Sequence, residues 1–174
     1  MRTIEVRVYK FSELSEKAKQ KAKDDYAINE GYTWGHEAVM SLKKLAEHFG
    51  GKVTDWSIDW FDASYSHAEF DMPYDMTVPE IHRRLKELGK YNADTLKGVG
   101  DCKLTGVFLD EDAIDGFRIS FKSGNIELPS LMQAAFKSLV KAGQSDCEDQ
   151  YSDETFGENC DANNYEFLAS GEIA

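Results

Sequence analysis

The spacing of apolar residues changes from every second to every fourth position within the first 26 residues, and this change constrains the fold most. In TIEVRVY, residues 3–9, β-branched residues alternate with charged ones. This alternation predicts a half-buried strand. Apolar residues then recur at helical spacing at Leu14, Ala18, Ala22 and Tyr26. The two small alanines in this stripe indicate close approach to another element.

A second alternating segment, KVTDWSIDWFDASYSHAEFDM, covers residues 52–72. Trp56, Ile58 and Trp60 share one face of this segment, and the alternation resumes at Ala68 after a short polar turn. The pattern predicts a β-hairpin. Because tryptophans on one face bury a large area, we expect this hairpin to anchor the core.

Helical spacing returns in four more segments: residues 33–49, 77–89, 130–151 and 153–163. The stretch 104–128 stays open between strand and helix, since Asp110 could cap a short helix whereas FRISF has strand character. A short final strand is predicted over Tyr165–Leu168. We therefore expect an α+β fold in a single domain, residues 1–174. Its mostly antiparallel sheet would join the N-terminal strand, the tryptophan-rich hairpin and the C-terminal strand, with helices packed on one face.

The chain is strongly acidic, with 20 Lys and Arg against 32 Asp and Glu and a net charge of −12. Such a charge repels phosphates and anionic lipids, so we expect neither direct nucleic-acid binding nor membrane binding. The opening MRTIEVRVYK lacks the apolar stretch of a signal peptide. The three cysteines, Cys102, Cys147 and Cys160, show no CxxC spacing and are expected to be reduced thiols in the cytoplasm.

No pattern typical of a catalytic or metal site stands out. Asp110, Asp112 and Asp115 resemble half of a cation-binding loop, but position 5 of an EF-hand register would be Ile114, so the match fails. Cys102 and His67 could form a catalytic pair only through a tertiary contact. We therefore assign no catalytic residue, metal or cofactor, and keep a small Cys/His- or metal-dependent enzyme as the alternative function.

The acidic residues concentrate near the end of the chain. From Ser145 onward there are nine Asp and Glu and no Lys or Arg. This segment either keeps the protein soluble or docks onto a basic groove of another protein, with interspersed aromatic residues as anchors. The candidate partner-binding residues are Asp146, Glu148, Asp149, Tyr151, Asp153, Glu154, Glu158 and Asp161.

Three segments together resemble a family of small acidic proteins encoded by bacteriophages and prophages. They are TIEVRVYKFSELSEKAKQKAKDDY, CKLTGVFLDEDAID and DANNYEFLASGEI. The resemblance does not extend to the hairpin between Asp55 and Met72. The family is largely uncharacterised and provides no catalytic residues, but it implies a phage protein in the cytoplasm of a bacterial host.

These observations lead to one main hypothesis. The chain is a non-enzymatic phage accessory protein that binds a host or phage protein with a basic surface. By analogy with anti-CRISPR proteins and nucleic-acid mimics, it could inhibit nucleic-acid-handling or defence machinery. A structural or assembly module with a merely solubilising acidic surface is a further alternative.

Overall fold

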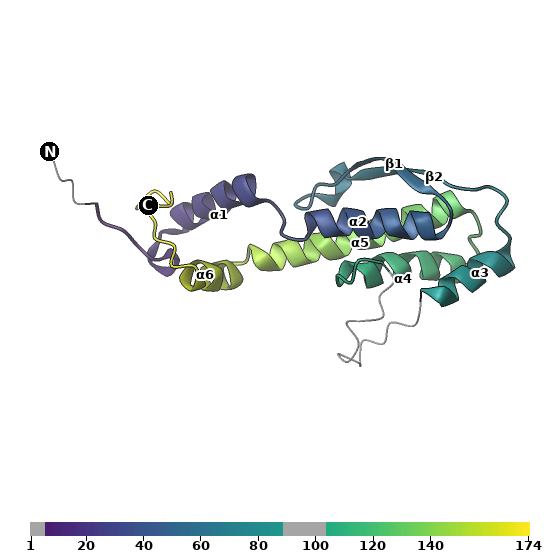
Figure 1. Cartoon of the computed structure of the whole chain (residues 1–174). Helices are drawn as coiled ribbons and strands as arrows, with labels where there is room; N and C mark the ends of the chain where they lie inside the picture. The colour runs from purple at the N-terminus through teal and green to yellow at the C-terminus, as the bar shows by residue number, and fades with distance from the viewer. Residues whose placement is uncertain (1–5, 89–103) are drawn as a thin grey trace. The chain divides into compact units, whose positions relative to one another are not determined.

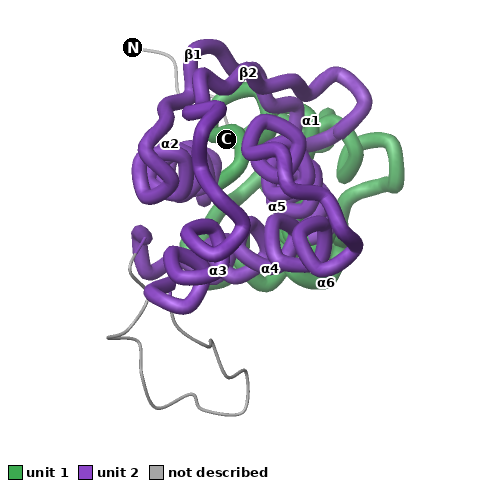
Figure 2. The backbone as a smooth tube through the Cα atoms, turned by 90° about the vertical axis from the view of Figure 1, so that its right-hand side faces the viewer, with its two compact units in different colours: residues 1–33, 146–174 green, residues 34–145 purple. Residues whose placement is uncertain are grey.

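A computed structural model describes residues 6–88 and 104–174 of the chain. Its backbone divides into two compact units (Figure 2). Unit 1 combines both chain ends, residues 1–33 and 146–174, and unit 2 comprises residues 34–145. The described residues form six α-helices and one two-stranded sheet (Figure 1).

Unit 1 contains helices from both ends of the chain. Its elements are the 3₁₀ turn η1 (Phe11–Glu13), α1 (Glu16–Glu30), the last residues of α5 (Leu128–Gln150) and α6 (Asp153–Ala162). Ser15 begins α1 as an N-cap, with its hydroxyl accepting a hydrogen bond from the Ala18 amide at 3.3 Å. The chain ends meet at Tyr9 and Phe167, which exchange two backbone hydrogen bonds of 2.9 Å.

The core of unit 1 confirms the helical stripe predicted from the sequence. It is formed by Phe11, Leu14, Ala18, Ala22, Phe156, Cys160 and Phe167. The expected close approach at the alanines also occurs, because a Cβ added to Gly171 would lie 2.2 Å from the Ala18 carbonyl oxygen. Gly171 has φ +94, a conformation that side chains disfavour. The C-terminal segment therefore lies directly on the α1 backbone.

Unit 2 is a helical assembly with a small sheet. Its elements are α2 (Gly35–His48), β1 (Lys52–Ser57), the 3₁₀ turn η2 (Ala63–Tyr65), β2 (His67–Asp71), α3 (Val78–Glu87), α4 (Leu109–Lys122) and α5 up to Ser145. The broad apolar face of α2 is buried, as its spacing predicts. Phe49 at the end of α2 stacks on Phe117 of α4, with ring centroids 4.4 Å apart.

The prediction of a mostly antiparallel sheet is wrong. Over residues 6–88 and 104–174, the fold is mainly helical and its single sheet contains only β1 and β2. The N-terminal alternation places Val6 and Val8 in exposed positions, 60% and 36% accessible. Tyr9 and Phe167 form isolated bridges instead of strands. Alternation specifies a face but supplies no partner strand, and here the described part of this segment gains only that bridge.

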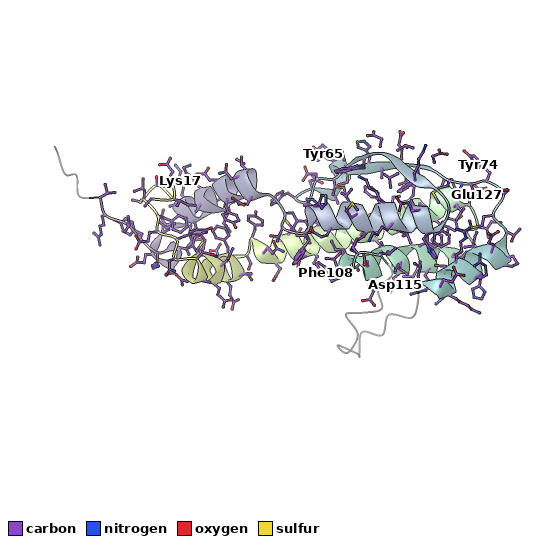
Figure 3. All side chains as sticks on the ribbon, viewed as in Figure 1. Lys17, Tyr65, Tyr74, Phe108, Asp115 and Glu127 are labelled. Atoms are coloured by element: carbon purple, nitrogen blue, oxygen red, sulfur yellow. The ribbon has the colours of Figure 1, made fainter. Side chains whose placement is uncertain are left out.

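Of the two tryptophans of the hairpin, Trp60 packs against the helices, with its ring directly on Gly35 and Gly143, whereas Trp56 does not join the core as expected. The strands pair with a register shift between Val53 and Asp55, and such a bulge changes which face the following side chains occupy. Trp56 is 42% exposed, with the Lys43 ammonium 5.5 Å from its ring centroid. Trp60 lies beyond β1 and is half-buried. Figure 3 shows Tyr65 and Tyr74 projecting from the two ends of the hairpin.

The ambiguous stretch 104–128 contains helix α4 (Leu109–Lys122). The interpretation of FRISF as a strand is therefore wrong. Ala113, Ile114 and Phe117 recur at helical spacing and are buried. Gly116 permits the close packing of α4 on α5, because a Cβ there would lie 2.5 Å from Ser138 Cβ and 2.6 Å from the Ala134 carbonyl oxygen. Helical periodicity across the whole segment outweighs the local strand propensity.

We predict that Gly116→Ala lowers the free energy of unfolding by up to about 2 kcal/mol. Overpacking against a backbone oxygen costs about 1–3 kcal/mol, and the better helix propensity of alanine returns about 1 kcal/mol. Urea denaturation followed by circular dichroism measures the change. Ile119→Ala on the same helix is the control, since Ile119 is 68% exposed and should change stability by less than about 0.5 kcal/mol. Equal stabilities of both variants would contradict this packing.

Candidate functional site

Helix α6 carries more carboxylates of the acidic segment than any other element, and local sequence fixes its position. The Ser152 hydroxyl caps the helix by accepting a hydrogen bond from the Thr155 amide at 3.2 Å. Asp153 and Glu154 occupy the first turn, where the helix dipole favours negative charge. Phe156 and Cys160 are almost fully buried in the core of unit 1. The rotation of α6 about its axis is thereby fixed.

Three carboxylates of α6 form an outward row that we call the acidic stripe: Glu154, Glu158 and Asp161. Residues four and three positions apart lie on the same face of a helix, and all three side chains are exposed. None of them forms an ion pair with the residues described by the structure. The stripe therefore presents three uncompensated negative charges on an ordered scaffold.

Asp153, in contrast, is neutralised within unit 1. The Lys23 ammonium donates a hydrogen bond to it at 2.7 Å, and the Lys19 ammonium lies 3.6 Å away. Helices α1 and α6 lie side by side at this contact (Figure 1). The hydrogen bond and charge of Lys23, with a smaller contribution from Lys19, hold the pKa of Asp153 below its usual value.

The other two lysines of α1 at alternate positions differ in their pairing. Lys21 forms ion pairs with Asp25 at 2.6 Å and with Glu172 at 3.7 Å. Lys17 remains exposed on the outside of α1 (Figure 3). Within the C-terminal acidic segment, Asp153 and Glu172 are thus paired with lysines of α1, whereas the carboxylates of the acidic stripe are not.

The end of α5 supplies the remaining candidate residues. Asp146 is half-buried and accepts hydrogen bonds of 2.7 Å from the Tyr32 hydroxyl and the Gln150 amide nitrogen. Glu148 and Asp149 are exposed. Tyr151 is half-buried, and its hydroxyl donates to the Gly31 carbonyl oxygen at 2.9 Å. Asp146 and Tyr151 therefore hold unit 1 together, whereas Glu148 and Asp149 face outward.

Some of the acidic residues stand at the C-terminal ends of helices, where they reduce stability. Glu148 and Asp149 lie in the last turn of α5 and Asp161 lies in the last turn of α6, and neither of these turns contains a basic residue. The negative end of the helix dipole disfavours a carboxylate there by about 0.3–1 kcal/mol. Selection for stability alone would place lysine or arginine at these positions.

The residues of the alternative enzyme do not form a site in the described part of the chain. Asp110 is 2% exposed and accepts hydrogen bonds from the Thr105 and Gly106 amides, and Asp115 pairs with Arg118. Helix α4 begins at Leu109, so the prediction that Asp110 caps it is wrong. Asp110 instead fixes the preceding turn. No cluster of metal-ligating side chains occurs among the described residues.

The proposed Cys–His pair involves a residue that the structure does not describe. His67 Nε2 lies 3.3 Å from Asp55 on the exposed hairpin, and Cys102 lies outside the described residues. The other two cysteines, Cys147 and Cys160, are buried. Burial raises the pKa of Cys160 to about 11, which keeps this thiol protonated and unreactive.

Sequence reasoning missed an aromatic pocket in unit 1. It has a volume of about 190 Å³ and is lined by Tyr26, Thr33, Gln150, Tyr151, Thr155, Phe156 and Asn159. From the sequence, Tyr26 is expected in an apolar helix stripe and Tyr151 is expected to contact a partner. The concentration of aromatic residues at the two chain ends was the available signal, but nothing in the sequence showed that these residues meet.

Comparison with known proteins gives no identification. The chain matches no protein-family model, no curated protein and no solved structure. Among the described residues, no helix is long and apolar enough to span a membrane.

We predict that Asp153→Asn lowers the stability of the protein by up to about 1 kcal/mol at neutral pH, as expected for a partly exposed ion pair. The folded-state pKa of Asp153 lies below its ordinary value of 3.8. Its stabilisation is therefore present above that value and is lost as the pH falls through the folded-state pKa. Urea denaturation as a function of pH should show the two proteins converging in acid.

Glu154→Gln is the matched control for this experiment, because it removes a neighbouring carboxylate from the same first turn without breaking an ion pair. Because Glu154→Gln removes only the interaction of a carboxylate with the helix dipole, we expect it to lose less stability than Asp153→Asn at neutral pH. If both variants lost the same stability, the contact between Lys23 and Asp153 would contribute nothing.

Proposed function

We propose that this protein binds the positively charged, nucleic-acid-binding surface of another protein through the acidic stripe and the adjoining end of α5. The partner's own nucleic acid would then be excluded, so that binding inhibits it. One observation carries the proposal: Glu154, Glu158 and Asp161 form a row on an ordered helix without ion pairs to the described residues. The protein acts by occupying a cationic surface and performs no chemistry there.

The spacing of the stripe supports imitation of a nucleic-acid strand. At a rise of about 1.5 Å per residue, Glu154 and Glu158 are separated by about 6 Å along the helix axis, and Glu158 and Asp161 by about 4.5 Å. A DNA strand carries a phosphate about every 3.4 Å along its axis. The stripe is therefore somewhat less dense than one strand, but it covers about three phosphate steps, and the outward carboxylates of α5 add charge nearby in the chain.

The arrangement of charge favours docking over simple solubility. A solubilising surface requires only net charge, whereas here the lysines of α1 neutralise Asp153 and Glu172 and leave the stripe unpaired. Carboxylates also stand at helix C-termini, where they weaken the fold. Residues that lower stability without a local benefit are expected at functional sites. A negative field of this kind also accelerates encounter with a basic partner.

The proposed setting is a bacteriophage infection. The opening, middle and closing segments resemble small acidic phage proteins, and small acidic phage proteins often act by blocking host proteins. The targets best matched by the stripe are proteins that bind nucleic acid through a basic groove, including the defence and DNA-handling machinery of the host. This part of the proposal rests on analogy and on the sign of the charge.

We expect neutralisation of the stripe to abolish partner binding. The variant Glu154→Gln/Glu158→Gln/Asp161→Asn should lose at least tenfold in affinity, about 1.4 kcal/mol, for proteins that the wild type captures from a bacterial lysate at low salt. Captured proteins should elute with added salt and be displaced by duplex DNA. Purified partners can then be titrated directly.

The matched control is Glu47→Gln/Asp75→Asn/Glu127→Gln in unit 2. These three carboxylates are exposed and form no ion pair with described residues, so the control changes the net charge by the same amount. It should retain wild-type binding. If both variants bound equally, net charge rather than the stripe would govern association, and the solubilising role would be favoured.

A further inference from the structure

The aromatic pocket of unit 1 provides a second recognition feature beside the stripe. Its volume of about 190 Å³ is below the roughly 300–1,000 Å³ of pockets that hold drug-sized ligands. A pocket of this size suits a single side chain. Its walls come from α1, the end of α5, α6 and the turn after α1, so residues from both ends of the chain enclose it.

Three rings form the apolar part of the pocket. The centroid of Tyr26 lies 6.2 Å from that of Tyr151 and 5.4 Å from that of Phe156, with both rings at steep angles to Tyr26. Tyr151 and Phe156 are nearly parallel, with centroids 6.1 Å apart. A cation within about 6 Å of an aromatic centroid is attracted by the negative face of the ring. Because Phe156 is almost fully buried, the half-buried Tyr26 and Tyr151 supply the ring surface that a cation can reach.

The two phenols remain neutral. Burial, followed by nearby ionisable groups that include Glu30, raises the pKa of Tyr26 and raises that of Tyr151 to about 12. The lining contains no carboxylate. Glu30, three residues before Thr33 in the chain, is exposed at the end of α1.

The pocket adjoins the acidic stripe around the α6 axis. Successive residues of a helix are rotated by about 100°, which places Thr155 and Asn159 in the sector next to Glu158. Farther around the helix axis, Phe156 points toward the core of unit 1. The remaining lining groups, Thr33 and Gln150, offer hydroxyl and amide oxygens, and the Thr33 hydroxyl donates to the Gln150 amide oxygen at 3.2 Å. A basic segment lying along the stripe would therefore reach this pocket.

We propose that the pocket binds an arginine side chain of the basic partner. This inference rests on the proposed function and names the residue type that the site recognises. A guanidinium is planar, weakly hydrated and stacks on aromatic faces, while its several N–H groups can donate to the hydroxyl and amide oxygens of the lining. A lysine ammonium is strongly hydrated and would gain no direct carboxylate in this pocket. The stripe supplies attraction to any cation, and the pocket supplies the preference for arginine.

Two defined peptides test the preference. One is a fluorescently labelled, unstructured Gly/Ser peptide containing several arginines, and the other has lysine at each of those positions. Anisotropy titrations of the wild-type protein should give about tenfold tighter binding of the arginine peptide. Equal affinities of the wild-type protein for the two peptides would overturn the pocket assignment.

Tyr26→Leu removes a ring, and we expect it to remove the arginine preference while binding of the lysine peptide is retained. Tyr26→Phe keeps the ring and is the matched control, which should preserve the preference. Thr33→Trp fills the pocket from an exposed position and should also abolish the preference, so the test does not depend on the stability of the leucine variant. A preference that survives both Tyr26→Leu and Thr33→Trp would contradict the proposal.

The stripe variant separates this inference from the function on which it rests. Neutralising Glu154, Glu158 and Asp161 should weaken both peptides to the same extent and leave their ratio unchanged. If the wild type bound both peptides equally but lost them on stripe neutralisation, the docking function would stand and the pocket would fail. If the arginine preference persisted while the stripe variant bound like the wild type, the pocket would stand and the stripe would fail.

Discussion

The side of α6 that carries Phe156 and Cys160 is buried against Phe11 and the alanine face of α1, and the direction of every carboxylate on that helix follows from this packing. Ring contacts of 5.0 Å between Phe11 and Phe156 and 6.1 Å between Phe11 and Phe167 draw both chain ends into one core. Without this core the acidic segment would be a charged tail of no fixed shape. With it, the segment becomes a surface with a defined pattern.

The lysines of α1 decide which carboxylates of this surface are paired. Lys19 and Lys23 compensate the one α6 carboxylate that faces α1, and Lys21 compensates Glu172. These pairs are partly exposed and contribute little stability individually, but they remove the carboxylates nearest α1 from any interaction with a partner. On α6, the remaining carboxylates, Glu154, Glu158 and Asp161, point outward in a single row. The aromatic pocket lies beside this row and takes Thr155, Phe156 and Asn159 of its lining from the same helix.

Sequence periodicity predicted much of the helical structure and the hairpin of β1 and β2, but the two terminal strands expected in the same sheet are not formed by the described residues. The apolar stripes of α1 and α2 are buried at the expected positions, because a helix satisfies its own backbone and needs only one apolar face. Strand predictions failed for residues 6–9 and for Tyr165–Leu168, because a strand also requires a neighbour that alternation does not identify. The residues of the stripe were among the candidate partner-binding residues, because acidic residues concentrate near the end of the chain. The pairing of Asp153 and the pocket were not predictable, since both depend on contacts between distant segments.

The buried thiols of unit 1 have an experimental use. Cys147 and Cys160 are each 1% exposed, and Cys160 sits inside the core that orients α6. An alkylating reagent reaches such a thiol only while the surrounding structure is open. Once Cys102 has been replaced by serine, the rate at which the remaining cysteines are labelled reports how often the packing around α6 opens. Slower labelling in the presence of a binding partner would show that the partner holds unit 1 closed.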